Sequence, residues 1–323
     1  MRLINTNSLQ LKEFFGDIPP YAILSHTWAA DVDEVTFQEF RKRKKVTRAK
    51  SGYKKIQRAA EQATKDGYEW LWVDTCCIDK RSSAELSEAI NSMFKYYARS
   101  EICYALLSDV TIGEDLASPN SGFRTSRWFL RGWTLQELIA PWEVIFFCSS
   151  WLQLGKRSEM ADLIQDVTGI DQDALIGHPL EEFSVAKRMS WASPRSTKRI
   201  EDQAYCLFGL FNVSMPPLYG DGPKAFIRLQ EEIIKWTDDH SLLAWTESCQ
   251  QAREWEILAP SPVQFLAGNG DDPHEAHCRS LLVNNRAILE LSKIKGTAHT
   301  FRRLSIRYGP LSEEFESRRI YLW

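Results

Sequence analysis

The amino-acid sequence predicts an α/β fold built on an open parallel β-sheet with helices on both faces. Four short apolar runs alternate with segments whose apolar residues recur at helical spacing. The runs are continuously apolar, which is typical of parallel strands covered on both faces. Right-handed crossovers then place the intervening helices on both sides of the sheet. In open sheets of this kind, ligands bind beyond the carboxyl ends of the strands.

The predicted strands and helices alternate through the first 150 residues. Strands are expected at residues 21–25, 70–73, 102–107 and 144–147. Helices are expected at residues 52–63, from Ser82 or Ser83 through Tyr97, and at residues 129–139. Gly67 should end the first helix and Pro141 the last, because a left-handed glycine and a proline both stop helices.

The remainder of the chain changes character. Helical spacing dominates up to about residue 246 and is clearest at residues 156–167 and 226–236. Short apolar runs at residues 281–283 and 287–291 then predict strands. We therefore expect three parts: an α/β domain at residues 1–150, a helical extension packed on it at residues 151–246, and a small β-rich segment at residues 247–323. The last segment ends on an apolar run and is expected to be truncated.

Composition excludes several classes of protein. Hydrophobic residues make up 44% of the 323 residues and charged residues 26%, which is typical of a soluble globular protein. The formal net charge is −3, so no protein-wide field favours nucleic acid or a membrane. No apolar run reaches the roughly 18 residues of a membrane span, and no signal-peptide core is present. Seven cysteines without Cys-x-x-Cys spacing predict free buried thiols, as in a cytoplasmic protein.

Polar residues gather at the predicted carboxyl ends of the strands and in the helix before the fourth strand. Trp133 and Glu137 are four residues apart, so they share one helix face. A glutamate beside aromatic rings is expected to have a raised pKa or to bind sugar hydroxyls. The candidate binding residues are Ser25, His26, Trp28, Asp74, Cys76, Arg127, Arg131 and Trp133, with Glu137 as the catalytic candidate.

Each candidate also has an explanation that needs no ligand. Glu137 alone would be expected as a solvated helix residue or a salt-bridge partner. Asp74 is equally expected to cap the turn after its strand, and His26 to be a buried residue with satisfied hydrogen bonds. Convergence of these residues on one sheet edge, and not any single residue, favours a functional site.

Three further patterns carry weaker hypotheses. Cys76 or Cys77 as nucleophile with His26 as base would make a cysteine hydrolase, although two adjacent cysteines are more often small buried hydrophobes. The run Arg41–Lys50 holds seven basic residues in ten and is expected to be a solvated loop or a contact for an anionic partner. The group of His274, His277 and Cys278 lacks an evident fourth ligand, so we expect no metal site.

Three ordered motifs resemble those of fungal heterokaryon-incompatibility (HET) domains. The first is Tyr-Ala-Ile-Leu-Ser-His-Thr-Trp at residues 21–28. The second joins Gly-Tyr-Lys-Lys-Ile at residues 52–56 to Trp-Leu-Trp-Val-Asp-Thr-Cys-Cys-Ile-Asp-Lys at residues 70–80. The third joins Ser-Arg-Trp-Phe at residues 126–129 to Arg-Gly-Trp-Thr-Leu-Gln-Glu-Leu at residues 131–138. Residues 189–209 and 215–220 look like the helical extension common in these proteins.

The resemblance implies a role in fungal self/non-self recognition that ends in cell death. HET domains are also distantly similar to Toll/interleukin-1 receptor (TIR) domains, which have a flavodoxin-like sheet and many of which cleave NAD. The TIR pattern Trp-x-x-x-Glu-Leu matches Trp133, Glu137 and Leu138, and Ser25 matches the serine that ends the first TIR strand. The His-Thr-Trp turn after Ser25 departs from the TIR pattern, and residues 74–77 have no close TIR counterpart. These departures put the orientation of NAD in question.

This resemblance implies NAD or a related nucleotide as substrate, no separate cofactor, and either a homo-oligomer or a partner death-signalling protein. Two alternatives stay open at this point. The domain could be a non-enzymatic death-signalling or oligomerisation module, or the cysteine hydrolase described above. The upstream trigger, the reaction product and the activity of the isolated chain do not follow from the sequence.

Overall fold

The computed structural model describes residues 1–245 and 258–266, and the backbone of three strands between residues 288 and 321. The chain forms two compact units. The first comprises Met1–Pro179 with Arg195–Thr197, and the second comprises Leu180–Pro194 with Lys198–Trp323. The domain boundaries that the sequence predicts after residues 150 and 246 stay predictions, because a compact unit and a domain need not coincide.

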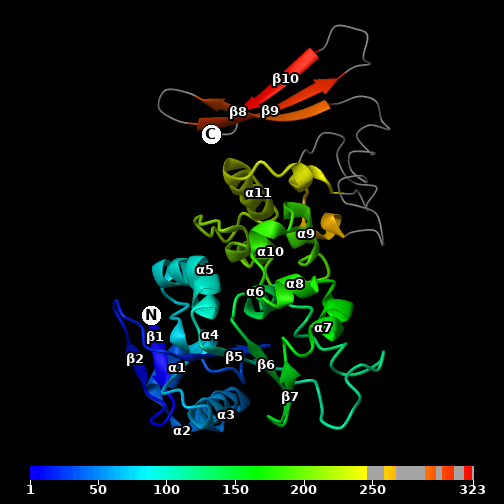
Figure 1. Cartoon of the computed structure of the whole chain (residues 1–323). Helices are drawn as coiled ribbons and strands as arrows, with labels where there is room; N and C mark the ends of the chain where they lie inside the picture. The colour runs from blue at the N-terminus through cyan, green and yellow to red at the C-terminus, as the bar shows by residue number, and fades with distance from the viewer. Residues whose placement is uncertain (246–257, 267–287, 296–299, 309–315, 322–323) are drawn as a thin grey trace. The chain divides into compact units, whose positions relative to one another are not determined.

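A seven-stranded sheet with the order β2-β1-β4-β3-β5-β6-β7 forms the centre of the first unit (Figure 1). Its strands are β1 (Arg2–Asn5), β2 (Leu11–Glu13), β3 (Ala22–His26), β4 (Trp70–Val73), β5 (Ile102–Leu106), β6 (Val144–Phe147) and β7 (Gln153–Lys156). The central strands β4, β3, β5 and β6 are parallel and correspond to the four predicted apolar runs. The α/β class and the parallel centre of the sheet are therefore confirmed.

Short antiparallel strands extend the sheet at both edges, and the sequence did not predict them. The β1–β2 pair lies beside β4, and β7 pairs with β6. Because β7 occupies residues 153–156, the helix expected to begin at residue 156 begins only at Ala161, as α7 (Ala161–Thr168). These strands have only three or four residues; β2 and β7 have no buried side chain, and β1 has only the pair Leu3 and Ile4, so no apolar run of strand length marks them.

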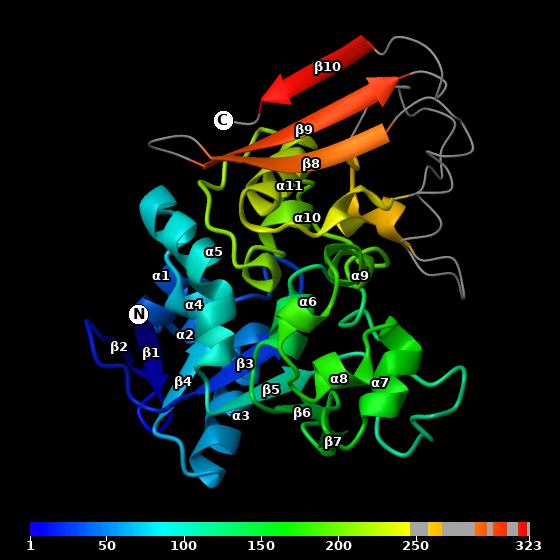
Figure 2. The same cartoon turned by 45° about the horizontal axis from the view of Figure 1, so that its top comes forward.

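Helices cover both faces of the sheet, as predicted. Helix α3 lies on one face, and α5 and α6 lie on the other (Figures 1 and 2). The helices of this unit are α1 (Phe37–Lys42), α2 (Lys45–Ala49), α3 (Ser51–Lys65), α4 (Asp74–Cys77), α5 (Ser83–Ala98), α6 (Thr134–Ile139), α7 and α8 (Gln172–Leu175). The predicted N-cap of α5 is confirmed, since the Ser82 hydroxyl accepts the Glu85 N–H. Helix α6 is shorter than predicted, because turns occupy residues 127–130 before it.

Large aromatic side chains fill the space between the sheet and its helices. Trp72 of β4 packs edge-on against Tyr97 of α5, with 5.9 Å between ring centres. Trp128 packs edge-on against Phe146 of β6 at 5.6 Å. Burying a side chain of this size contributes roughly 1.5–3 kcal/mol of stability. The aromatic packing therefore fixes the elements that carry the polar residues at the carboxyl edge of the sheet.

The second unit combines short helices with a separate antiparallel sheet of order β10-β9-β8. Its elements are η1 (Leu180–Glu182), α9 (Val185–Ser190), α10 (Asp202–Tyr205), η2 (Gly209–Phe211), α11 (Lys224–Trp236), η3 (His240–Leu243), η4 (Pro262–Phe265), β8 (Ile288–Lys295), β9 (Thr300–Tyr308) and β10 (Glu316–Tyr321). Helix α11 confirms the helix predicted at residues 226–236. The run at residues 281–283 and the group around His274 lie outside the described residues.

A buried acidic pair organises the turn before α11. The Glu201 carboxylate accepts the backbone N–H groups of Gly220 and Gly222 at 2.8 and 3.2 Å. Asp202 accepts the Tyr219 hydroxyl at 2.9 Å. Both glycines have positive φ, which a side chain would disfavour. Residues 201–202 thus hold the turn at residues 219–222 in place through side-chain hydrogen bonds.

Two further expectations concern thiols and membranes. The five described cysteines are free and buried, as predicted; they are Cys76, Cys77, Cys103, Cys148 and Cys206. No helix in the described part of the chain combines the length and the apolar composition required to cross a bilayer.

A glycine at the start of α3 allows a close backbone approach, and its substitution tests the packing there. A Cβ at Gly52 would lie 2.6 Å from the Asp33 carbonyl oxygen, which already accepts the Gly52 N–H. Gly52→Ala should therefore lower the free energy of unfolding by about 1–3 kcal/mol in urea denaturation. Ser51→Ala, at the exposed neighbouring position, should stay within about 0.5 kcal/mol of wild type. Equal urea midpoints for the two variants would contradict this account.

Candidate functional site

The order of the parallel strands creates a topological switch point at the carboxyl end of β3. The chain passes from β3 to β4 on one side of β3, and then crosses to β5 on the other side. The connections that leave β3 and β5 consequently diverge, toward α3 and toward α6. A ligand site in an open α/β sheet is expected at such a point. Ser25 and His26 end β3, and Asp74 directly follows β4.

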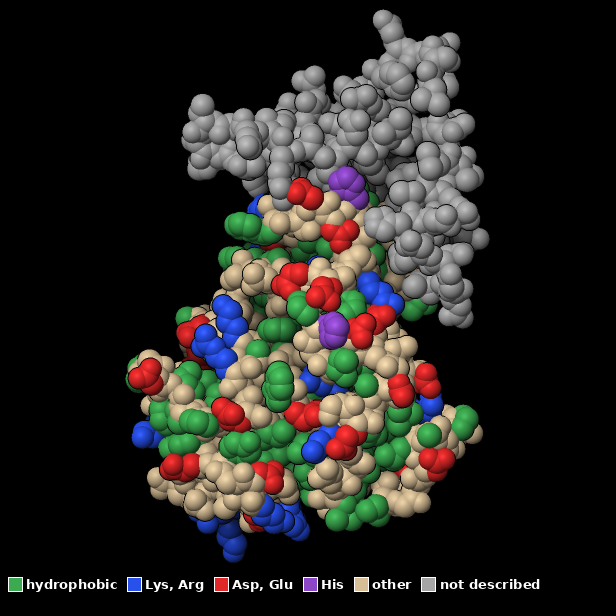
Figure 3. Space-filling view, in the orientation of Figure 1, with side chains coloured by type: hydrophobic (Ala, Val, Ile, Leu, Met, Phe, Trp, Pro, Cys, Tyr) green, Lys and Arg blue, Asp and Glu red, His purple; other side chains and the backbone are tan. Residues whose placement is uncertain are grey.

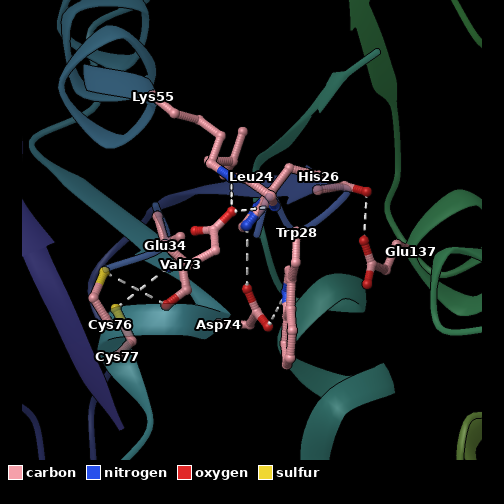
Figure 4. Close-up of polar contacts among 12 residues, drawn as sticks. Leu24, His26, Trp28, Glu34, Lys55, Val73, Asp74, Cys76, Cys77 and Glu137 are labelled. Atoms are coloured by element: carbon pink, nitrogen blue, oxygen red, sulfur yellow. Dashed lines mark hydrogen bonds and ion pairs between the residues drawn. The ribbon is translucent and has the colours of Figure 1, made fainter. Parts of the chain in front are cut away.

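Ser25 links Glu137 to a buried tryptophan. The Trp128 indole Nε1–H donates to Ser25 Oγ at 2.8 Å, and the Ser25 hydroxyl donates to Glu137 Oε2. An indole N–H can only donate, so it leaves the single Ser25 proton for the carboxylate. Trp128 itself is held edge-on by Phe129 and Phe146. This chain of hydrogen bonds fixes Glu137 over the end of β3 (Figure 4).

The protonation of Glu137 responds to this environment. Burial raises the pKa of Glu137 from 4.5 to about 7, although the Ser25 hydrogen bond acts in the opposite direction. The negative charge of Asp74 raises this pKa further, and the positive charge of Arg131 lowers it. Both forms of the carboxyl are therefore populated near neutral pH, as expected for a group poised to act at a site.

Asp74 forms a second cluster on the same edge. Its Oδ2 accepts the Trp28 indole N–H at 3.1 Å and the Lys80 ammonium at 3.3 Å. The Lys80 ammonium also lies 3.7 Å from the centre of the Trp28 ring, in a cation–π contact. Burial disfavours the carboxylate, but Lys80 and its neighbours outweigh that effect and lower the pKa of Asp74. Asp74 is thus ionised at neutral pH, whereas Glu137 is protonated in a substantial fraction of the molecules.

His26 lies inside the structure, behind Asp74. Its Nε2 is 3.8 Å from Asp74 Oδ1, and its side chain is only 1% exposed. Neither ring nitrogen has a hydrogen-bond partner among the described residues. Burial, reinforced by the positive charge of Lys55, lowers the pKa of His26 to about 3. The imidazole is therefore neutral and a weak base, which disfavours it as an activating group for a thiol.

A buried ion pair supports the turn that carries Trp28. Glu34 pairs with Lys55 of α3 and also accepts the Ala29 N–H at 2.8 Å (Figure 4). Burial opposes ionisation of Glu34, but the interactions with His26 and Lys55 lower its pKa overall. This pair and Lys80 were not predicted as part of the site. Neither residue type nor spacing marks them, because the contacts form between distant segments.

Arg131 places a cation beside the two clusters. Its guanidinium lies 5.7 Å from the centre of the Trp28 ring, and its buried Nε has no hydrogen-bond partner in the described structure. The backbone at this position is anchored, since the Arg131 carbonyl accepts from Arg195 at 3.0 Å. A fixed backbone with an available guanidinium suits binding of a planar or phosphate-bearing anion.

Three sequence candidates make no hydrogen bond to Ser25, Asp74 or Glu137 among the described residues. Arg127 is 70% exposed and its Nε pairs with Asp109 at 3.4 Å. Cys76 is fully buried against the Val73 carbonyl, and burial raises the pKa of its thiol well above 9. Trp133 is half-buried at the N-cap of α6. The edge therefore brings together Ser25, Trp28, Asp74, Arg131 and Glu137, with His26 enclosed behind them.

Comparison with known proteins adds an independent observation. Residues 21–120 match the family model named heterokaryon incompatibility protein (HET). This chain carries a HET domain. The match includes Ser25, Trp28 and Asp74 and ends before Arg131 and Glu137. Residues 224–314 match a second family model, a domain of unknown function, DUF8212.

A curated relative extends the similarity beyond the HET domain. The chain is 49% identical over 225 residues to the vegetative incompatibility protein HET-E-1 of Podospora anserina. The aligned region covers 68% of this chain but 16% of the relative, so the chain spans a small part of that protein's length. No solved structure matches the chain.

The raised pKa of Glu137 predicts a pH-dependent stability. Below pH 4.5 the carboxyl is protonated in both folded and unfolded states and has no effect. As pH rises from 4.5 to about 7, the unfolded state loses the proton first, so folding becomes less favourable. Relative to Glu137→Gln, wild type should therefore lose up to about 3 kcal/mol across this window and then level off.

Denaturant unfolding of both proteins between pH 4 and 8.5 measures this difference. Glu159→Gln removes an exposed carboxyl that lies 3.6 Å from the Lys156 ammonium, and it should show no such trend. A stability difference between wild type and Glu137→Gln that stays constant with pH would refute the buried-carboxyl account.

Proposed function

We propose that this HET-domain protein is a cytoplasmic effector of fungal heterokaryon incompatibility whose activity ends in cell death. The HET match and the 49% identity to a vegetative incompatibility protein support this role. We further propose that its chemistry is cleavage of NAD at the bond between nicotinamide and ribose. The observation that carries this proposal is the Glu137 carboxylate held by Ser25 beside Asp74, Trp28 and Arg131.

The topology of the sheet is consistent with this chemistry. Numbered along the chain among themselves, the parallel strands have the order 2-1-3-4, with which flavodoxin-like sheets also begin. TIR domains have such a sheet, and the Trp133, Glu137, Leu138 pattern resembles theirs. The short helix α6 places Glu137 over the end of the first parallel strand, β3. The support is thus a carboxylate at the edge where this type of sheet binds ligands.

Each side chain has a distinct role in the proposed reaction. The C1′–N bond breaks, its electron pair leaves with nicotinamide, and positive charge develops on the ribose. Ionised Glu137 holds the ribose hydroxyls and stabilises that charge, while Ser25 keeps the carboxylate in position. Trp28 offers a flat ring, and Arg131 pairs with the pyrophosphate. Water then adds at C1′ and releases a proton, which gives ADP-ribose and nicotinamide.

Glu137→Gln provides the direct test. The amide keeps the shape of the side chain but removes the charge, so nicotinamide release should fall on the order of 10²–10³-fold. Release is measured by chromatography with purified protein and NAD, at several protein concentrations because we propose that the active form is a homo-oligomer. Glu159→Gln should match wild type. Equal release from wild type and Glu137→Gln would refute the assignment of Glu137.

Ser25→Ala tests the electrostatic part of the mechanism. Loss of the Ser25 hydrogen bond removes an interaction that favours the carboxylate, so the pKa of Glu137 should rise above about 7. Activity requires the ionised form and should increase with pH in wild type, with its midpoint near that pKa. The midpoint for Ser25→Ala should move to higher pH. An unchanged pH profile would contradict the role of Ser25.

A second candidate function is a non-enzymatic death-signalling module that associates with itself or with a partner. The observation that favours it is the exposure of large apolar side chains in the first unit, above all Trp142 and Phe15 at 86% and 85%. A folded Glu137→Gln protein that still kills cells on overexpression would favour this function. The cysteine hydrolase has less support, because Cys76 and Cys77 are buried; alanine at either position should leave nicotinamide release intact.

A further inference from the structure

A cleft separate from Glu137 opens at the same edge of the first unit. It has a volume of about 590 Å³, within the range of small-molecule sites. The turn after β3, the first half of α3 and the loops after β5 and β6 line it. The residues used below are Trp28, Lys54, Lys55, Arg58, Arg127 and Trp151. Glu137 is not among the residues that line this cleft.

The charge of the cleft is uniformly positive. Lys54, Lys55, Arg58 and Arg127 line it, and none of its described lining residues is acidic. Lys55 is committed to the buried pair with Glu34. The other three cations remain available to a ligand, since Lys54 is exposed and makes no ion pair with any described residue. Arg58 and Arg127 have only long contacts, to Glu61 and Asp109 at 3.5 and 3.4 Å.

Two indole rings line the cleft together with these cations. Trp28 is fixed by its hydrogen bond to Asp74. Trp151 has φ of +63°, a left-handed backbone conformation that is unfavourable for a bulky residue. The backbone N–H of Trp151 donates to the Cys148 carbonyl at 2.9 Å, and this hydrogen bond closes the turn. Strained residues of this kind cluster at ligand sites, where the surrounding structure maintains them.

The positive charge continues from the cleft onto the surface. Exposed cations of α1, of α2 and of the turn between them precede α3, where Lys54 and Arg58 lie; they are Arg41, Lys42, Lys44, Lys45 and Arg48. In the space-filling view, basic side chains gather along the lower edge of the molecule, where Figure 1 shows α2 and α3 (Figure 3). Such a concentration of one charge raises the local concentration of anions. The sequence predicted this basic run as a solvated loop, but most of it is helical, in the last turn of α1 and in α2.

We infer that this cleft binds a nucleoside diphosphate, with the base against the Trp28 and Trp151 indoles and the diphosphate on Lys54, Arg58 and Arg127. An open cleft with flat rings and several cations fits a compact, ring-bearing polyanion. An acidic peptide spreads its charges along an extended chain, whereas a nucleoside diphosphate joins one flat ring to a compact pair of phosphates. Trp28 is common to this cleft and to the proposed reaction, but Lys54, Arg58 and Trp151 have no role in the Glu137 chemistry, so variants at those three positions test the inference by itself.

Calorimetric titration of the full chain tests the inference, with ADP, inorganic pyrophosphate and adenosine as probes. ADP should bind more tightly than either fragment, and its affinity should fall as salt is raised. Lys54→Ala and Arg58→Ala should each weaken ADP binding on the order of tenfold. Lys65→Ala, an exposed lysine at the other end of the same helix, should bind ADP like wild type.

A third variant isolates the aromatic contribution. Trp151→Asn removes the ring but places a residue that tolerates the left-handed conformation. It should weaken ADP and adenosine binding and leave pyrophosphate binding unchanged. Glu137→Gln should bind ADP like wild type, since Glu137 does not line the cleft.

The results separate this inference from the proposed function. No ADP binding by wild type at millimolar concentration would overturn the inference, as would ADP affinities of Lys54→Ala and Arg58→Ala equal to that of Lys65→Ala. Loss of ADP binding in folded Glu137→Gln would also overturn it. Intact ADP binding without any nicotinamide release would sustain the cleft and refute the NAD chemistry alone.

Discussion

The Ser25 hydroxyl is the group on which the arrangement of the site depends. It accepts from the Trp128 indole, which has no capacity to accept, and so it must direct its own proton toward Glu137. The donor is locked by aromatic packing against β6, and the acceptor lies on α6. One hydroxyl at the end of β3 therefore ties together three parts of the fold. The direction of both hydrogen bonds follows from the fact that an indole N–H can only donate.

Two carboxylates at this edge have opposite electrostatic environments. Asp74 has a lysine, an indole N–H and an imidazole within reach, and its pKa is lowered. Burial raises the pKa of Glu137 to about 7, even though hydrogen bonds from the Ser25 and Tyr97 hydroxyls favour the carboxylate. Two neighbouring carboxyl groups whose pKa values differ in this way are characteristic of sites in which one group stays ionised and the other exchanges a proton near neutral pH. His26, buried and neutral, separates the Asp74 cluster from the buried Lys55–Glu34 pair.

Sequence patterns were sufficient for the parts of the fold that depend on local periodicity. The four parallel strands and helix α3 follow from apolar runs, and the N-cap of α5 follows from Ser82 and Glu85. The edge strands could not be predicted, because β7 is a polar segment that pairs only in the context of β6. The position of Ser25 and Glu137 at the same edge of the sheet could be predicted from the order of the strands and motifs. The contacts of Lys80 and Trp128 depend on tertiary packing, which no spacing reveals.

The short strands at the two margins of the sheet bear on how copies of this protein can meet. At one margin β2 has three residues, and Lys12 and Glu13 are exposed; at the other, β7 is a four-residue strand that includes Gly155 and Lys156. Brief, charged margins are poor templates for adding a further strand from another molecule. Growth by continuous strand pairing is thus disfavoured for this unit. Contacts between copies of this unit are therefore expected to use side-chain surfaces, which can be specific and reversible.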